Sequence, residues 1–219
     1  MDWMKDGERS LLKGALVIAK FRYPELDIVA LLNLFDQIKR NVWLELNVYL
    51  TPLEQINVIN GILYNYYKMT GKEITERDSN LFFVNRTLES KQGNAYSIGI
   101  IYLALCELLD IPVFAIDLPK QFVLAYFDSL FPFQSPNSEP VQTLQFYIDP
   151  VNGMVYTQND VNLYLKKLKV AHEPHFFEPM DSRQVLLRML DELAQSYEYT
   201  NEQEKAVEIQ QLMGILNTA

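Results

Sequence analysis

The chain contains few of the residues on which several common architectures depend. It has eight glycines and a single cysteine, Cys106, among 219 residues. So few glycines argue against a glycine-rich nucleotide-binding loop and against a barrel with many tight turns. A single cysteine excludes an intramolecular disulfide.

Long apolar runs are also missing. No stretch reaches the roughly 18 consecutive apolar residues that a membrane-spanning helix needs. The first seven residues carry acids where a signal peptide needs a basic start followed by an apolar run. We therefore expect a cytoplasmic protein with no membrane partner.

Positive charge is scarce. The chain has 19 lysines and arginines against 28 aspartates and glutamates, which gives a formal net charge of −9. Proteins that bind nucleic acids need a basic face to offset phosphate repulsion. The compact basic cluster of Lys166, Lys167 and Lys169 is typical of the solvated side of a helix. Nucleic acid is therefore not expected as a partner.

Hydrophobic residues are plentiful, at 49% of the chain, and include 13 tyrosines and 12 phenylalanines. Apolar residues recur at helical spacing over residues 9–20 and 27–38, and a capping box of Thr51 and Glu54 begins a third helix. Residues 95–109 are apolar nearly all round, which is typical of a helix buried at the centre of a domain.

The pattern changes after residue 110. Four short runs of β-branched and aromatic residues predict strands at 111–116, 122–127, 144–148 and 154–156. Because these runs lie so close together along the chain, the sheet should be antiparallel.

Polar segments separate the other elements. Residues 70–80 predict a loop and residues 91–94 a turn. A helix over residues 161–168 is expected to be capped by Asn159 and Asp160. Two final helices, joined by a polar turn at 199–201, should pack as an antiparallel pair.

These elements predict an α+β fold in which a buried central helix packs against a small antiparallel sheet. We divide the chain into an N-terminal helical part at 1–80, a helix-plus-sheet core at 81–170, and a C-terminal helix pair at 171–219. All three parts are expected to form one structural domain.

Several segments, in this order and spacing, carry a family resemblance. They are Tyr23-Pro24-Glu25-Leu26-Asp27, Gly93-Asn94, Ser97-Ile98-Gly99-Ile100-Ile101-Tyr102, Ile111-Pro112-Val113, Phe122-Val123-Leu124-Ala125-Tyr126 and Tyr147-Ile148-Asp149-Pro150. Over nearly the whole chain they resemble the bacterial SirB-type transglutaminase-like family. The resemblance implies a papain-like or transglutaminase-like core with tetratricopeptide-like helices at the C-terminus.

The resemblance also implies where chemistry would take place. Transglutaminase-like proteins use a cysteine at the start of the central helix, a histidine on the next strand pair and a carboxylate on a later strand. Here the helix begins with Asn94-Ala95-Tyr96-Ser97, which contains no cysteine, and Ser97 is the one nucleophile-like group. The position of the histidine falls on Gln121, and the carboxylate is Asp149. Candidate groove residues are therefore Asn94, Tyr96, Ser97, Gln121 and Asp149.

Each of the three triad-equivalent residues also has a structural interpretation. Ser97 without a general base is inert, and a hydroxyl at a helix start commonly binds backbone N–H groups. Gln121 cannot titrate, so it either packs or hydrogen-bonds a ligand amide. Asp149 precedes Pro150 and fits an Asx-type turn as well as a relic of the triad.

The remaining reactive side chains have weaker claims to a role. Cys106 lies inside the central helix and should behave as a small apolar residue. His172 and His175 would bind a metal only with added ligands such as Glu173 or Glu178, and they are more typical of a plain surface loop. We expect neither a metal nor a cofactor.

Two functions follow from these residues. The first is a non-catalytic interaction or regulatory protein, a pseudoenzyme that binds an unknown protein or peptide through a degenerate groove and the C-terminal helices. The alternative is an active hydrolase or acyltransferase with an atypical nucleophile. The alternative requires a base such as His172 or His175 within hydrogen-bond reach of Ser97.

Overall fold

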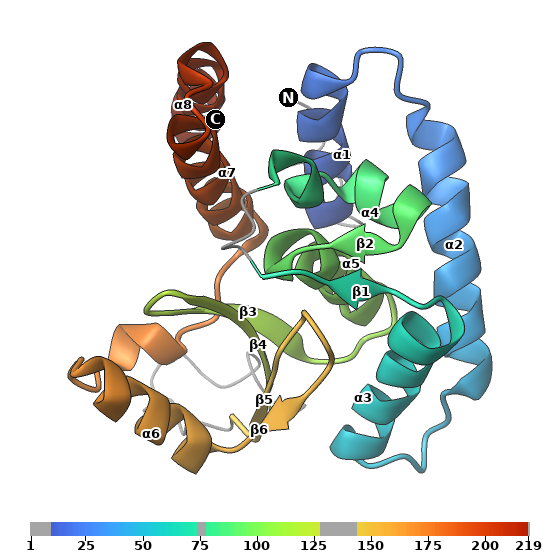
Figure 1. Ribbon diagram of the computed structural model, residues 1–219. Helices are drawn as coiled ribbons and strands as arrows, with labels where there is room; N and C mark the ends of the chain where they lie inside the picture. Colours follow the sequence, from blue (N-terminus) through green and yellow to red (C-terminus); the bar gives the residue numbers. More distant parts are fainter. Residues whose placement is uncertain (1–9, 74–77, 128–143, 219) are drawn as a thin grey trace.

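The computed structural model describes residues 10–73, 78–127 and 144–218. The helices and strands follow one another along the chain as drawn in Figure 1. In order they are α1 (Ser10–Arg22), α2 (Ile28–Glu45), α3 (Pro52–Asn60), the π-helix η2 (Gly61–Tyr66), β1 (Thr70–Gly71), the 3-10 helix η4 (Ser79–Phe82), α4 (Val84–Ser90), β2 (Gln92–Gly93), α5 (Ala95–Leu108), β3 (Val113–Leu118), β4 (Gln121–Tyr126), β5 (Phe146–Ile148), β6 (Val155–Tyr156), α6 (Gln158–Leu168), the 3-10 helix η5 (Pro174–Phe177), α7 (Ser182–Tyr199) and α8 (Gln203–Thr218). The fold is α+β and mostly helical, which confirms the predicted class.

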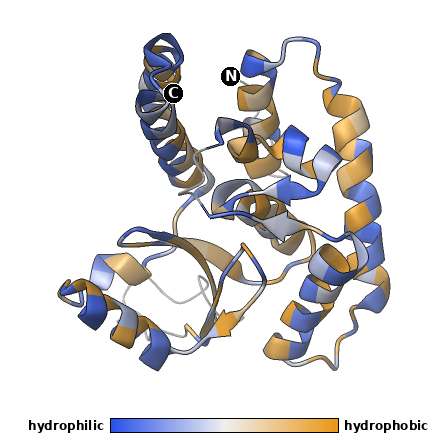
Figure 2. Ribbon diagram, in the orientation of Figure 1, coloured by the Kyte–Doolittle hydropathy of each residue, from blue (hydrophilic) through white to orange (hydrophobic). Residues whose placement is uncertain are grey.

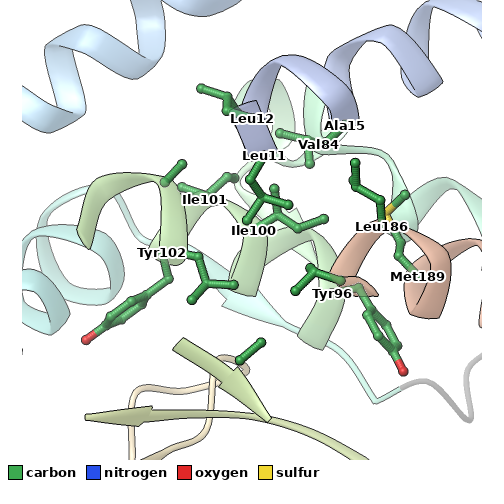
Figure 3. Packing of buried hydrophobic residues seen from close by; sticks show 14 of the residues in the cluster. Leu11, Leu12, Ala15, Val84, Tyr96, Ile100, Ile101, Tyr102, Leu186 and Met189 are labelled. Atoms are coloured by element: carbon green, nitrogen blue, oxygen red, sulfur yellow. The ribbon is translucent and has the colours of Figure 1, made fainter. Parts of the chain in front are cut away.

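Helix α5 forms the centre of the molecule. Every residue from Ala95 to Cys106 is buried, as its nearly continuous apolar sequence predicts. Figure 3 shows Ile100 and Ile101 of this helix among side chains of α1 and α4, with Met189 of α7 also in the cluster. Helix α5 is therefore held on the side away from the sheet by helices that come from both ends of the chain.

The sheet packs against the other side of α5. Its four strands are antiparallel, as predicted, and they lie in the order β3-β4-β5-β6. A Cβ atom added to Gly99 of α5 would lie 2.6 Å from Cε1 of Phe122 in β4, so glycine allows the helix to approach the strand this closely. The ring of Tyr96 lies 4.6 Å from the same phenylalanine, centroid to centroid.

Alternate residues of β4 point to opposite faces of the sheet. Phe122, Leu124 and Tyr126 belong to the cluster around α5. Ala125 instead belongs to a smaller cluster with Val161 and other residues of α6 and η5. The sheet is therefore covered on both faces. This agrees with the sequence of β4, which has few polar residues to place in water.

Two short strands were missed by the sequence analysis. Residues Thr70–Gly71 and Gln92–Gly93, expected in a loop and a turn, pair as a two-residue parallel ladder. Segments of two residues are too short to show the alternation that marks a strand. The ladder matters because it holds the start of α5 beside the segment that follows β5, where Gly71 N–H donates to the Val151 carbonyl at 3.2 Å.

The start of α6 also differs from the prediction. The N-cap is Thr157, not Asn159 or Asp160, and the helix begins at Gln158. Thr157 and Asp160 form a reciprocal capping box, in which Asp160 accepts from the Thr157 backbone and hydroxyl. Asp160 is thus the third residue of the helix rather than its cap.

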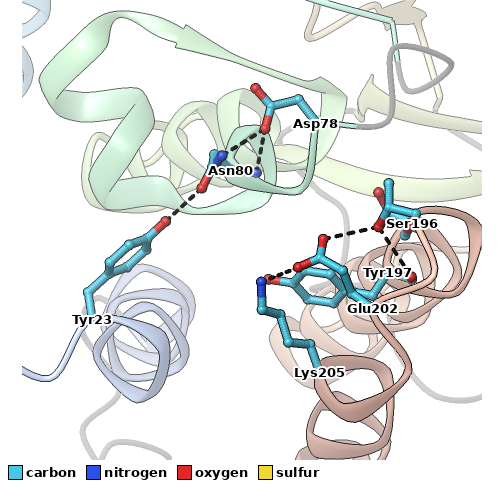
Figure 4. Close-up of polar contacts among 8 residues, drawn as sticks. Tyr23, Asp78, Asn80, Ser196, Tyr197, Glu202 and Lys205 are labelled. Carbon is cyan, nitrogen blue, oxygen red and sulfur yellow. Dashed lines mark hydrogen bonds and ion pairs between the residues drawn. The ribbon is translucent and has the colours of Figure 1, made fainter.

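The C-terminal helices α7 and α8 pack against each other, as predicted. Their turn is fixed by Glu202, which accepts a hydrogen bond from Thr200. Glu202 also pairs with Lys205 (Figure 4). Helix α7 is attached to the sheet by Arg188, whose Nε lies 3.0 Å from Oδ1 of Asp117 in β3.

One buried cluster includes residues from α1, α5 and α7, so core side chains come from all three predicted segments. Figure 2 shows hydrophobic residues (orange) along α1 and the strands, with many hydrophilic residues (blue) on α8. The division at residues 80 and 170, and the tetratricopeptide-like character of the tail, stay predictions. Among the described residues, no helix has the length and apolarity required to cross a membrane.

Candidate functional site

A pocket of about 580 Å³ opens between the start of α5, the β3–β4 hairpin, the β5–β6 turn and α6. We call it the Gln121 pocket. Its walls include Ala95, Gln121, Asp149 and three tyrosines, Tyr147, Tyr156 and Tyr164. This volume lies in the range of roughly 300–1,000 Å³ that is usual for ligand sites in proteins.

The structure brings together some of the predicted site residues and separates others. Gln121 and Asp149 line the pocket, although they come from different strands or turns. Asn94, Tyr96 and Ser97 do not line it, and each is at most 1% exposed within the core. The helix-start residue on the pocket wall is Ala95. The position that faces Gln121 and Asp149 therefore carries a methyl group.

The Ser97 hydroxyl is fully occupied by structural hydrogen bonds. Its Oγ donates to the Leu81 carbonyl at 2.6 Å. It accepts from Thr87 Oγ1 at 2.9 Å and from the Asn94 backbone N–H at 3.1 Å. A serine hydroxyl has one donor and two acceptor sites, so none is left for a substrate.

Asn94 and Ser97 also explain why Ala95 faces the pocket. The Asn94 side chain accepts from the Tyr96 and Ser97 backbone N–H groups at 3.0 and 3.1 Å. This reciprocal capping box turns the cap residue and the third helical residue toward each other in the core. An asparagine three residues before a serine fits a capping pattern, so the sequence carried a signal that both side chains begin the helix.

Gln121 begins β4 and is exposed. Tyr164 also lines the pocket, and its hydroxyl donates to the Pro119 carbonyl at 2.8 Å. An amide has no proton affinity near neutral pH and cannot act as a general base.

Asp149 adopts the turn geometry that its place before Pro150 favours. Its Oδ1 accepts from the Val151 N–H at 2.8 Å, and its carbonyl accepts from the Gly153 N–H at 2.8 Å. Burial raises the pKa of the Asp149 carboxyl, while hydrogen bonds from Val151 and Asn152 oppose this effect. The carboxylate is thus bound to its own turn.

Helix α3 and η2 hold that turn in place. The Tyr64 hydroxyl donates to the Pro150 carbonyl at 2.8 Å, and Asn60 Nδ2 donates to the Gly153 carbonyl at 2.8 Å. Gly153 has φ of 75°, a left-handed conformation that favours glycine. The wall of the pocket that contains Asp149 is therefore rigidly supported by the N-terminal helices.

The tyrosines supply neutral hydroxyls to the pocket. Burial raises the pKa of Tyr147 to about 12, and its hydroxyl donates to Gln158. The pKa of Tyr156 is raised by burial and then by the nearby carboxylates of Asp149, Asp160 and Glu73. These phenols stay protonated near neutral pH and serve as hydrogen-bonding groups.

The other reactive side chains lie outside this pocket. His175 pairs with Glu173 at 3.2 Å, and His172 stacks on Phe177 with ring centroids 4.5 Å apart. Neither histidine is a hydrogen-bond partner of Ser97. Cys106 is completely buried, as predicted, and burial raises the pKa of its thiol. In the described segments no three histidines, cysteines or acids are grouped as metal ligands would be.

Comparison with known proteins gives the family of this chain. The model of the transglutaminase-like superfamily matches residues 30–191, which is well over half of the chain. SirB1 of Salmonella typhimurium is 23% identical over 185 residues, which cover 82% of this chain and 64% of SirB1. No solved structure matches significantly.

Two further relatives belong to the UPF0162 proteins. YchA of Escherichia coli K12 is 24% identical over 181 residues, covering 80% of this chain and 63% of YchA. A protein of Xylella fastidiosa is 24% identical over 214 residues, covering 90% of this chain and 68% of the relative. The chain thus matches less than two thirds of the length of SirB1 and of YchA. It belongs to the transglutaminase-like superfamily, and its similarity to SirB1 and YchA places it in the SirB-type bacterial family.

Proposed function

We propose that this protein is a non-catalytic member of its family that binds a protein or peptide segment in the Gln121 pocket. The observation that carries the proposal is the set of side chains that meet on the pocket wall where the start of α5 faces the strands. Ala95, Gln121 and Asp149 share one pocket, yet the first has no nucleophile and the second no base.

The runner-up function, an acyl-transferring enzyme with an atypical nucleophile, has less support. Ser97 is buried and its hydroxyl is committed to Leu81, Thr87 and Asn94. Breaking these bonds would leave buried polar groups without partners, at a cost of about 1–3 kcal/mol for each group. The Ser97 hydroxyl is therefore better understood as part of the helix start.

The walls of the pocket suit an extended polypeptide. The Gln121 amide can donate to or accept from backbone groups, the tyrosine hydroxyl oxygens can accept from them, and Leu118, Phe122 and Val123 add apolar surface. Side-chain amides and phenols that stay neutral recognise peptide groups without transferring a proton. We propose that the C-terminal helices α7 and α8 provide a second surface for regulatory contacts. Their exposed sides do not pack against the core and are free to contact a partner.

A selection for binding tests this proposal. A random-peptide display library is selected on the wild-type protein and counter-selected on Gln121→Trp, which fills the pocket at an exposed strand position that tolerates an aromatic residue. We expect peptides that bind the wild type at least about tenfold more tightly than the variant, a free-energy difference of about 1.4 kcal/mol.

The matched control is Lys166→Trp, an exposed substitution on α6 outside the pocket lining, which should leave peptide affinity unchanged. If the selected peptides bind Gln121→Trp as tightly as the wild type, the Gln121 pocket is not the binding site and the proposal is wrong. Circular dichroism of both variants verifies that the fold is retained.

A further inference from the structure

Large apolar side chains lie in water where α2 leads into α3. The exposed residues are Trp43, Leu44, Val48, Tyr49 and Leu53, and we call them the α2–α3 corner. Val48 and Tyr49, which form its tip, are 91% and 90% exposed. Figure 1 shows this connection at the periphery of the fold, and Figure 2 shows hydrophobic residues (orange) along it.

The turn that carries the tip is held by its own hydrogen bonds. The Tyr49 N–H donates to Oδ1 of Asn47 at 3.0 Å. On the far side of the tip, the capping box of Thr51 and Glu54 fixes the start of α3. Because the backbone is already ordered, little conformational entropy remains to be lost when Val48 and Tyr49 bind a partner.

A groove adjoins the tip. It has a volume of about 610 Å³ and opens between α2 and the end of α5. We call it the α2 groove. Its apolar wall consists of Trp43, Leu44, Leu108 and Leu109. Leu44 precedes Val48 by one helical turn, so a concave apolar surface lies directly beside a projecting one.

The groove and the tip differ in charge. Lys39 and Arg40 line the groove together with Asp36, which pairs with Lys39 at 3.7 Å. Arg40 makes no ion pair within the described residues, so the groove has an excess of positive charge. The tip is flanked along the chain by two acids, Glu45 and Glu54. The groove of one molecule therefore attracts the tip of another.

The exposed area of the corner is close to what a dimer interface needs. Its five residues together expose about 700 Å², if a fully exposed aliphatic or aromatic residue presents about 150–250 Å². The largest apolar patch on a typical monomer covers only about 300–600 Å². A stable interface of standard size buries about 800 Å² on each partner.

We infer that the α2–α3 corner joins two copies of this chain in a two-fold symmetric dimer, in which the tip of each copy enters the α2 groove of the other. A two-fold interface uses the same surface on both subunits, so that surface must be complementary to itself. The corner meets this requirement because it carries both a groove and a tip, with opposite charges. The α2 groove shares no lining residue with the Gln121 pocket, so the inference does not depend on the proposed function.

Sedimentation equilibrium of the full chain tests the inference. We expect a monomer–dimer equilibrium with a Kd of about 10 µM or tighter, the weak end of the range for interfaces of standard size. Tyr49→Asp introduces a charge into the apolar contact and should raise the Kd at least about thirtyfold, the effect of an interface hot spot. Leu44→Arg, an exposed substitution in the groove wall, should have the same effect.

Two further variants control for nonspecific effects. Val29 is 68% exposed at the opposite end of α2, so Val29→Asp adds the same charge away from the corner and should leave the Kd unchanged. Val48→Asp repeats the test at the neighbouring tip position. Circular dichroism verifies that each variant is folded, which is expected because all these side chains lie on the surface.

Mixing two defective variants tests the exchange of tips. In a dimer of one Tyr49→Asp chain and one Leu44→Arg chain, an intact tip meets an intact groove at one contact. At the other contact the two introduced charges are opposite and attract. We expect the equimolar mixture to dimerise at least about tenfold more tightly than either variant alone.

Four results would overturn the inference. A chain that stays monomeric up to about 200 µM would lack the affinity that an interface of this size provides. A dimer unaffected by Tyr49→Asp and Val48→Asp would use another surface. A mixture that dimerises no better than the separate variants would rule out the exchange of tips. A monomer that sediments with phosphatidylcholine vesicles, and loses this property in Tyr49→Asp, would assign the corner to a lipid surface instead.

Discussion

Asn94 and Ser97 bind each other reciprocally at the start of α5. The Asn94 side chain accepts from the Ser97 backbone N–H at 3.1 Å, and the Ser97 hydroxyl accepts from the Asn94 backbone N–H at 3.1 Å. Both side chains turn inward to make these bonds. Of the residues at the start of the helix, it is Ala95 that lines the pocket. The helix start that carries a nucleophile in active transglutaminase-like proteins thus serves here to begin the helix.

Cysteine substitutions should separate the pocket-facing position from the buried one. A thiol in Ala95→Cys lies on the pocket wall at the positive end of α5, which favours the thiolate. A thiol in Ser97→Cys is enclosed in the core. We expect Ellman's reagent to label native Ala95→Cys at least about tenfold faster than native Ser97→Cys. Equal rates would mean that the helix start is not arranged as described.

The native cysteine provides the background for that experiment. Cys106 is 0% exposed, and burial raises the pKa of its thiol, so little thiolate forms. We expect the wild-type protein to react with a thiol reagent only when it unfolds, at a rate that follows the opening of the core. Labelling of the folded protein at the rate of a free peptide thiol would contradict this assignment.

Much of the fold could be predicted from the sequence because its elements carry strong local signals. The capping box at Thr51, the apolar sequence of α5 and the four strand-like runs each identify an element without reference to the rest of the chain. The parallel ladder of Thr70 and Gln92 could not be predicted, since two residues show no periodicity and their pairing depends on tertiary structure.

The site was less accessible to sequence reasoning. Gln121 and Asp149 could be found by resemblance, but the resemblance does not say which residue of the helix start faces them. Ser97 was the natural candidate because it carries a hydroxyl, and its three hydrogen bonds to Leu81, Thr87 and Asn94 depend on η4 and α4 packing beside α5. Ala95 carries no functional group and therefore gave no chemical signal.

The C-terminal pair should contribute substantially to stability. Leu190 of α7 is 1% exposed within the main cluster, so Leu190→Ala should lower the free energy of unfolding by about 2–5 kcal/mol. Val207 of α8 is 49% exposed, and Val207→Ala should change the free energy of unfolding by less than about 0.5 kcal/mol. Chemical denaturation of both variants measures the difference. A cost near zero for Leu190→Ala would show that the tail is a loosely attached appendage.

Asp149 should make the stability depend on pH in a defined direction. Burial raises its pKa in the folded state above the unfolded value. The contribution of Asp149 to the free energy of unfolding is therefore most favourable below the unfolded pKa. It is lost as the pH rises through the folded pKa. Asp149→Asn keeps an oxygen to accept from the Val151 N–H and cannot ionise.

We accordingly expect Asp149→Asn to become more stable relative to the wild type as the pH rises from about 3.5 to 6, a window that begins near the usual pKa of aspartate. The measurement is the midpoint of urea unfolding at several pH values. A difference between the two proteins that does not change with pH would contradict the assignment.

The pseudoenzyme account rests on Ala95 and Gln121, whose side chains supply neither a nucleophile nor a base to the Gln121 pocket, and acylation tests it most directly. The wild-type protein, Gln121→His, and Ala95→Cys combined with Gln121→His are incubated with p-nitrophenyl acetate or a glutamine amide, followed by intact-protein mass and peptide mapping. We predict no adduct at Ser97 in any of the three, and at most weak acylation of the new thiol in the double variant, because members of a triad act as a unit. A stoichiometric adduct on Ser97 of the wild-type protein would contradict the account and establish the alternative, an acyl-transferring enzyme.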